Sequence, residues 1–199
     1  KAKKIIKDFN GDTHKTVLFL SYKAENWNTM DNIYKKYCQE KDIKVIVQCV
    51  PYYYKNIDGT FEKYIDGGMY PEYVTITPIE DYNYVNENPD VIVFQYPYDN
   101  YNSAGTTDPV FYSYNLASHT QKLIYIPYFR TDEIDENDMR AYTNMDAYVT
   151  MPGVVYADKV IVQSEEIRKL YIKKLTDFFG EESEDEWEDK IEAEDIGGI

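Results

Sequence analysis

Short runs of apolar residues recur along the chain and alternate with polar stretches. The most uniform run is Val91–Phe94, which contains no polar residue. Such a run is typical of a strand buried on both faces, as in a parallel sheet with helices on each side. Pro97 ends it, because proline has no N–H to donate to a central ladder. The pattern therefore predicts a buried strand that covers Val91–Gln95.

The other apolar runs and the helical periodicities predict the remaining elements. Strands are expected at Thr16–Leu20, Ile43–Val50, Val74–Thr77, Leu123–Ile126 and Val160–Val162. Apolar positions at 3.6-residue spacing, together with capping residues, predict helices at 26–40, 108–118, 139–150 and from Ser164 to Gly180. The stretch between Tyr52 and Tyr73, which is rich in turn residues, is expected to be a long loop.

Strands that alternate with helices at this spacing predict an α/β fold, a doubly wound and mainly parallel sheet with right-handed crossovers. We expect Val91–Gln95 in the interior of the sheet, flanked by Thr16–Leu20 and Leu123–Ile126. The predicted domain covers residues 16–180, after an N-terminal extension at 1–15 and before an acidic, disordered tail at 181–199.

Three of the predicted strands end in the same dipeptide, Pro-Tyr, at Pro51, Pro97 and Pro127. If these strands are parallel, the three corners lie along one edge of the sheet, and this is the edge where ligands bind in open α/β sheets. The alternative is that Pro-Tyr is only a stop signal in a chain that contains 22 tyrosines. The sequence leaves both interpretations open.

The residues that follow the strand ends form a candidate site. The candidate ligand-binding residues are Tyr22, Lys23, Tyr52, Tyr98 and Tyr128. The tyrosines could stack on a sugar or polyol, and Lys23 could bind an anion, although an exposed lysine is a common surface feature. Asp99 is the candidate general base, since it is the only carboxylate at the central corner. An aspartate beside an asparagine is also typical of a plain turn.

Charge excludes one class of function. The net charge is −15, and residues 181–199 contribute ten acidic side chains and one lysine. A protein that binds a nucleic-acid backbone needs a basic face, so we expect no nucleic-acid partner.

No stretch is apolar and long enough to span a bilayer, and no secretion signal opens the chain, so we expect a cytoplasmic protein. Peripheral contact with the inner face of the membrane stays open.

The sequence contains no signature of a bound cofactor or metal. The segment after the first predicted strand has no glycine, so both the dinucleotide fingerprint and the P-loop are missing. The two histidines, His14 and His119, and the two cysteines, Cys38 and Cys49, have no metal-binding spacing. We therefore expect no cofactor.

Several segments resemble the amino-terminal half of bacterial CDP-glycerol glycerophosphotransferases, the teichoic-acid-type enzymes of cell-wall biosynthesis. The resembling segments are VLFLSYKAENWNTMDNIYK, VPYYYKNIDGTF, YPEYVTITPIEDYNY, PDVIVFQYPYDNYN, LIYIPYF and YADKVIVQSEEIRKLYIKKL, which cover most of residues 16–175. The resemblance implies a Rossmann-like domain, the acceptor-side half of a two-domain GT-B arrangement. Its implied partners are a polyol-phosphate or sugar acceptor and a C-terminal donor domain that this sequence does not contain.

The sequence departs from the family pattern at one important point. Typical members carry a Trp-His-Gly motif after a strand of the acceptor half, and its histidine is the expected base. The matching strand here ends in Ile126–Phe129, which includes no histidine. Two functions therefore stay open: the acceptor-side domain of a transferase, inactive as the fragment alone, or a binding or scaffolding module that keeps the fold and lacks the catalysis.

Overall fold

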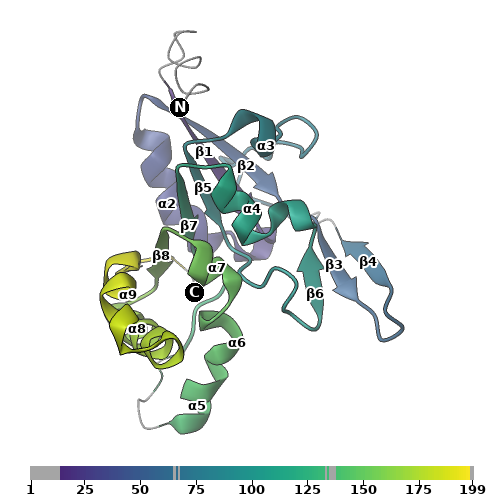
Figure 1. Ribbon diagram of the computed structural model, residues 1–199. Coiled ribbons are helices and arrows are strands. Elements are labelled where there is room, and N and C mark those ends of the chain that lie inside the picture. The colour runs from purple at the N-terminus through teal and green to yellow at the C-terminus, as the bar shows by residue number, and fades with distance from the viewer. Residues whose placement is uncertain (1–13, 65, 67, 133, 135–137, 198–199) are drawn as a thin grey trace.

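A six-stranded, all-parallel sheet forms the centre of the protein (Figure 1). The computed structural model describes residues 14–64, 66, 68–132, 134 and 138–197. The sheet has the order β2-β1-β5-β7-β8-β9. Its strands are β1 (Lys15–Ser21), β2 (Ile43–Cys49), β5 (Val91–Phe94), β7 (Lys122–Tyr125), β8 (Lys159–Val162) and β9 (Ile191–Ala193). The predicted N-terminal extension lies almost entirely outside the described residues.

Strand β5 lies in the interior of the sheet, as the uninterrupted apolar run predicts. It pairs in parallel with β1, Val93 opposite Phe19, and with β7, Val93 opposite Ile124. Ile92 and Val93 are fully buried. The predicted fold class and the predicted neighbours of this strand are thus confirmed.

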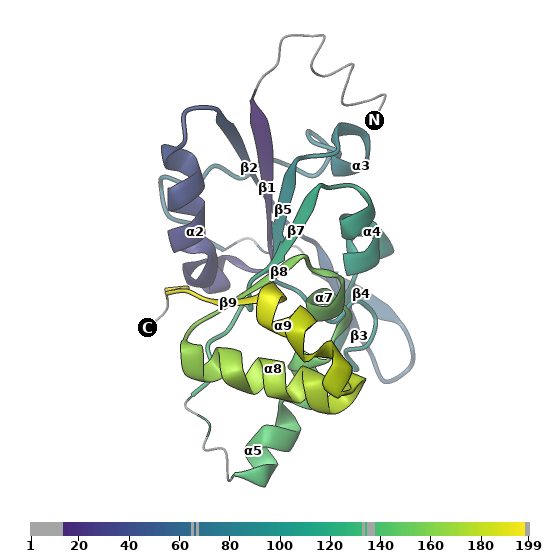
Figure 2. The ribbon, with the colours of Figure 1, turned by 60° about the vertical axis from the view of Figure 1, so that its left-hand side comes forward.

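Helices cover both faces of the sheet, which explains why its strands are apolar on both sides (Figure 2). The helices are α2 (Asn28–Gln39), α3 (Tyr84–Glu87), α4 (Ser113–Ser118), α5 (Met139–Asn144), α6 (Asp146–Val149), α7 (Pro152–Tyr156), α8 (Glu165–Phe179) and α9 (Glu184–Lys190), with short 3-10 turns η1 (Ala24–Asn26), η2 (Pro109–Phe111) and η3 (Glu181–Ser183). Val17 and Phe19 of β1 pack with Met30 of α2 on one face. On the other face, Leu18 and Leu20 belong to a cluster with apolar side chains of α4, α7 and α8.

Two of the expected helices differ in their extent. The helix expected at 108–118 is divided into η2 and α4, because Tyr112 between them has an extended backbone. The helix expected at 139–150 is divided into α5 and α6. The caps of α8 are as expected: Ser164 accepts a hydrogen bond from the N–H of Ile167, and Gly180 ends the helix at φ +110°.

A small antiparallel sheet projects from the carboxyl end of the large one, at the right of Figure 1. It consists of β4 (Phe61–Tyr64), β3 (Tyr52–Lys55) and β6 (Gly105–Thr107), in that order. The expected long loop therefore begins with a hairpin, β3–β4, whose turn contains Gly59 at φ +82°. The short strand expected at Val74–Thr77 is reduced to one bridge between Ile76 and Val47.

The acidic C-terminal segment is part of the fold, so the prediction of a disordered tail at 181–199 is wrong for the described residues to 197. Helix α9 packs against α8, and β9 adds the sixth strand by pairing with β8. Three apolar side chains, Trp187, Ile191 and Ile196, are buried here. Their burial anchors the segment, and the acidic side chains between them face solvent. The domain thus continues past residue 180.

Among the described residues, no helix has both the length and the apolar character needed to cross a membrane.

Candidate functional site

The carboxyl ends of the parallel strands bring five tyrosines together, as the Pro-Tyr pattern predicts. This tyrosine cluster consists of Tyr22, Tyr52, Tyr96, Tyr98 and Tyr128. Tyr22 is at its centre, with ring centroids 4.9 Å from Tyr52, 5.1 Å from Tyr96 and 4.9 Å from Tyr128. The hydroxyls of Tyr98 and Tyr128 are 3.4 Å apart. The four predicted tyrosines therefore converge.

Sequence reasoning missed one member of the cluster, Tyr96, which directly precedes Pro97. Tyr96 is buried, and its hydroxyl donates a hydrogen bond to the backbone carbonyl of Gly105 in the small sheet, at 3.1 Å. This contact joins the two sheets beneath the cluster. The signal was available in the sequence, because Tyr96 and Tyr98 flank the same proline.

The rings pack on one another instead of lining a wide opening. Tyr52 and Tyr96 are buried, whereas Tyr22, Tyr98 and Tyr128 are partly exposed. Behind Tyr22 and Tyr96 lies a cavity of about 10 Å³, which has room for about one water molecule. Thr107 lines this cavity, and its hydroxyl has no hydrogen-bond partner among the described residues. The surface of the cluster is thus a set of ring edges and hydroxyls.

Burial raises the pKa of four tyrosines of the cluster, Tyr22, Tyr52, Tyr96 and Tyr98. Loss of solvent raises the pKa of Tyr22 well above its ordinary value, although the nearby Lys23 ammonium works in the opposite direction. Burial also raises the pKa of Tyr98, and its hydrogen bond with Tyr128 adds to the effect. These four hydroxyls therefore donate and accept hydrogen bonds and do not act as phenolate nucleophiles.

Lys23 supplies a cation at the edge of the cluster. It lies between β1 and η1, and its Nζ is 5.4 Å from the ring centroid of Tyr22 and 5.3 Å from that of Tyr52. The distance from Nζ to the Glu25 carboxylate is 3.5 Å, and the Glu25 side chain is largely exposed. The Lys23 ammonium therefore lies over two aromatic rings of the cluster, within the range of a cation–π interaction.

The position of the β1–α2 connection depends on Gln95, a residue that the sequence did not single out. Its side-chain oxygen accepts a hydrogen bond from the N–H of Tyr22 at 2.9 Å. Its side-chain nitrogen donates to the carbonyl of Asn26 and to the hydroxyl of Thr29, both at 2.9 Å. Gln95 is fully buried, so these bonds hold the segment that carries Tyr22 and Lys23 in one conformation.

A second set of contacts holds the same connection from the other side. The hydroxyl of Tyr70 donates to Ser21 Oγ at 3.1 Å. The carboxylate of Asp66 accepts a hydrogen bond from the N–H of Ala24, the first residue of η1. The residues that follow β1 are thus fixed by segments distant in the sequence.

Asp99 is close to the cluster in sequence, but its carboxylate is directed elsewhere. The side chain is 4 % exposed, and its two oxygens accept hydrogen bonds from the N–H and the hydroxyl of Ser113, at 2.9 and 2.8 Å. The carboxylate of Asp99 is therefore bonded to the first residue of α4. Burial raises its pKa to about 6, and the bonds from Ser113 oppose that rise. Its role as a general base stays a prediction.

The described residues include no group of three or more His, Cys, Asp or Glu side chains that could hold a metal ion. The expected absence of a cofactor stays a prediction.

Comparison with protein-family models, with curated proteins and with solved structures finds no match to this chain.

Proposed function

We propose that this protein is the acceptor-side domain of a CDP-glycerol glycerophosphotransferase-like transferase of teichoic-acid biosynthesis. Its ligand is a polyol-phosphate or sugar acceptor, bound at the tyrosine cluster. One observation supports this most directly: the Lys23 ammonium and the tyrosine rings converge at the carboxyl edge of an all-parallel sheet. That edge is the usual ligand site of open α/β sheets.

The chemistry of the cluster fits an acceptor that is both anionic and rich in hydroxyls. The Lys23 ammonium can pair with a phosphate group, and a charge-assisted bond of this kind is stronger than a neutral one. The hydroxyls of Tyr98 and Tyr128 can donate hydrogen bonds to the hydroxyls of a polyol and accept hydrogen bonds from them. The protein as proposed is cytoplasmic, or peripheral at the inner face of the membrane, and binds no nucleic acid.

A second function is favoured by one specific feature, the end of β7. The chain continues there as Ile126–Phe129, where the family pattern has its histidine, and Asp99 is bonded to Ser113. On this alternative the domain binds the same kind of ligand without catalysing transfer. In both cases we expect the domain alone to bind and not to turn over.

We expect sn-glycerol 3-phosphate to bind the domain in the millimolar range, and Lys23→Met to weaken that binding by about tenfold or more. Methionine is an unbranched side chain of similar length, but it carries no charge. Isothermal titration calorimetry measures both proteins, and Lys63→Met on exposed strand β4 is the matched control. Equal affinities of the Lys23→Met variant and the unmodified domain would contradict the proposed site.

The same titration with CDP-glycerol tests the division of labour between the two halves of such an enzyme. We expect binding no tighter than about 1 mM, or roughly −4 kcal/mol, because no glycine-rich phosphate loop follows β1. Micromolar affinity for CDP-glycerol would place the donor site in this domain and contradict the acceptor-side assignment.

A further inference from the structure

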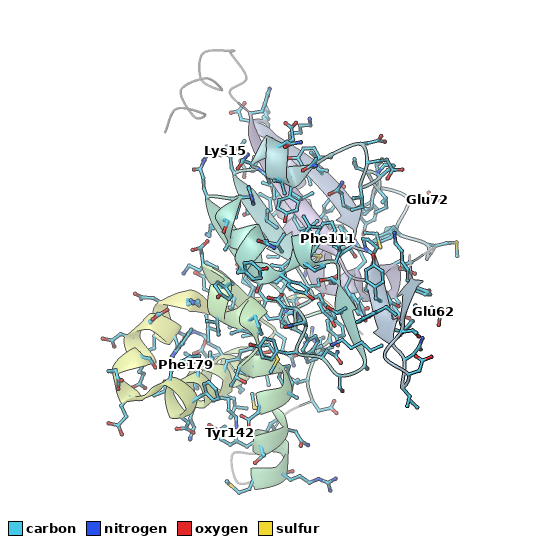
Figure 3. All side chains as sticks on the ribbon, turned by 45° about the vertical axis from the view of Figure 1, so that its right-hand side comes forward. Lys15, Glu62, Glu72, Phe111, Tyr142 and Phe179 are labelled. Atoms are coloured by element: carbon cyan, nitrogen blue, oxygen red, sulfur yellow. The ribbon has the colours of Figure 1, made fainter. Side chains whose placement is uncertain are left out.

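The hairpin β3–β4 presents one aromatic face toward the candidate site. Side chains alternate along a strand, and directly opposite residues of antiparallel strands share a face. The register pairs Tyr52 with Tyr64 and Tyr54 with Glu62. These four residues, which we call the hairpin face, therefore lie on the same side of the small sheet. Figure 3 labels Glu62 on the projecting hairpin.

The hairpin face continues the surface of the tyrosine cluster. Tyr52 contacts the central ring, Tyr22, at 4.9 Å, and also lies 4.9 Å from Tyr64 and 5.3 Å from Tyr54. Lys23 Nζ is positioned over both Tyr22 and Tyr52. The cation thus lies where the two aromatic surfaces meet.

Tyr54 and Tyr64 are the accessible part of this surface. Tyr54 is 42 % exposed and Tyr64 39 % exposed, whereas Tyr52 between them is buried. Their rings are 6.1 Å apart and meet edge to face, so they form a fixed corner. The hydroxyls of Tyr52 and Tyr54 are 3.1 Å apart, which restricts the rotation of Tyr54. These two rings therefore form an accessible aromatic surface next to the buried ring that lies under the Lys23 ammonium.

We infer that the hairpin face is a stacking platform for a pyranose ring, so that the ligand of this site is a sugar phosphate. The inference rests on the proposed function, because it uses the same cation, Lys23, for the phosphate. A pyranose has a flat face of C–H groups that can pack on a tyrosine ring. An acyclic polyol has no such face. Glu62 can accept hydrogen bonds from the ring hydroxyls, as a carboxylate has only acceptors.

The test compares three ligands by calorimetry: D-glucose 6-phosphate, α-D-glucose 1-phosphate and sn-glycerol 3-phosphate. We expect at least one glucose phosphate to bind about tenfold more tightly than glycerol 3-phosphate. Tyr54→Ala should remove that advantage and leave the affinity for glycerol 3-phosphate unchanged. Lys23→Met should weaken all three, because the phosphate is common to them.

Phe61→Ala is the matched control, since Phe61 is exposed on the opposite face of the same hairpin. It should leave all three affinities unchanged. Circular dichroism and the melting temperature show whether each variant is folded. If Tyr54→Ala is unfolded, Tyr54→Phe replaces it in the test. The platform then predicts that the glucose phosphate still binds more tightly than glycerol 3-phosphate.

The outcomes separate this inference from the proposed function. If all three ligands bind equally and Tyr54→Ala changes nothing, the platform is refuted while the Lys23 site stands. If none binds, both are refuted. An advantage of a glucose phosphate that survives Tyr54→Ala in a folded protein also overturns the platform.

Discussion

Replacing Trp187 by alanine should lower the free energy of unfolding by about 3–5 kcal/mol, the range measured for large aromatic side chains in cores. Trp187 lies in the acidic C-terminal segment and is only 3 % exposed. Its ring is 5.3 Å from that of Phe179, and its Nε1 donates to Ser183 Oγ at 2.9 Å. The substitution would therefore open a cavity between α8 and α9 and remove the hydrogen bond to the half-buried hydroxyl of Ser183.

Urea unfolding followed by far-UV circular dichroism measures this effect without relying on tryptophan fluorescence, which the substitution alters. Asp185→Ala is the control, because Asp185 is exposed in the same helix and should change stability by no more than about 0.5 kcal/mol. Similar midpoints for the two variants would mean that the C-terminal segment does not pack on the domain as described.

The C-terminal segment also shows where composition misleads. Ten acidic residues within 181–199 are typical of a disordered tail, and only Trp187, Ile191 and Ile196 argue otherwise. Three well-placed apolar side chains are sufficient, because α8 and β8 already offer surfaces for them. A short strand such as β9 gains its stability from the sheet it joins, and an isolated sequence pattern does not reveal it.

Five strands of the large sheet, β1, β2, β5, β7 and β8, could be predicted because each contains a run of apolar residues that is visible in the sequence without tertiary information. The hairpin β3–β4 could have been predicted as well. Asp58-Gly59 between two tyrosine- and phenylalanine-bearing runs is a hairpin signal, and the expected long loop overlooked it.

The hydrogen bonds that support the site could not be predicted from the sequence. Gln95 bonds to Tyr22, Asn26 and Thr29, which lie 66 to 73 residues away along the chain. Asp99 lies just past a strand end, which predicted a role at the edge of the sheet. Its partner Ser113 is 14 residues further on, and only the fold brings the two together.

Asp99→Asn should separate the two roles of this carboxylate. If Asp99 is the general base, the substitution in a protein that also carries the donor domain should reduce transfer by about 10²–10⁴-fold. If Asp99 only holds α4, turnover should be unchanged. The stability of the domain alone gives a second measurement, which does not require activity.

The pH dependence of stability follows from the raised pKa of Asp99. Between its ordinary value near 4 and its folded value of about 6, the folded protein binds the proton more tightly than the unfolded chain. The unfolding free energy contributed by Asp99 therefore rises as pH falls through this window, and at neutral pH the buried charge costs about 3 kcal/mol. Asparagine fits the left-handed backbone at this position, where φ is +49°, and can accept from the N–H of Ser113 and donate to its hydroxyl.

We therefore expect the stability difference between Asp99→Asn and the unmodified domain to depend on pH. It should favour the variant more at about pH 7 than at about pH 4, by about 2 kcal/mol, because asparagine removes the cost of the buried charge. Urea unfolding at a series of pH values measures it, with Asp185→Asn as the exposed control, which should show no such trend. A difference that is constant across this window would mean that Asp99 ionises like an exposed carboxylate. In that case burial at the start of α4 would not explain its position, and the case for a solvent-accessible base near the tyrosine cluster would gain support.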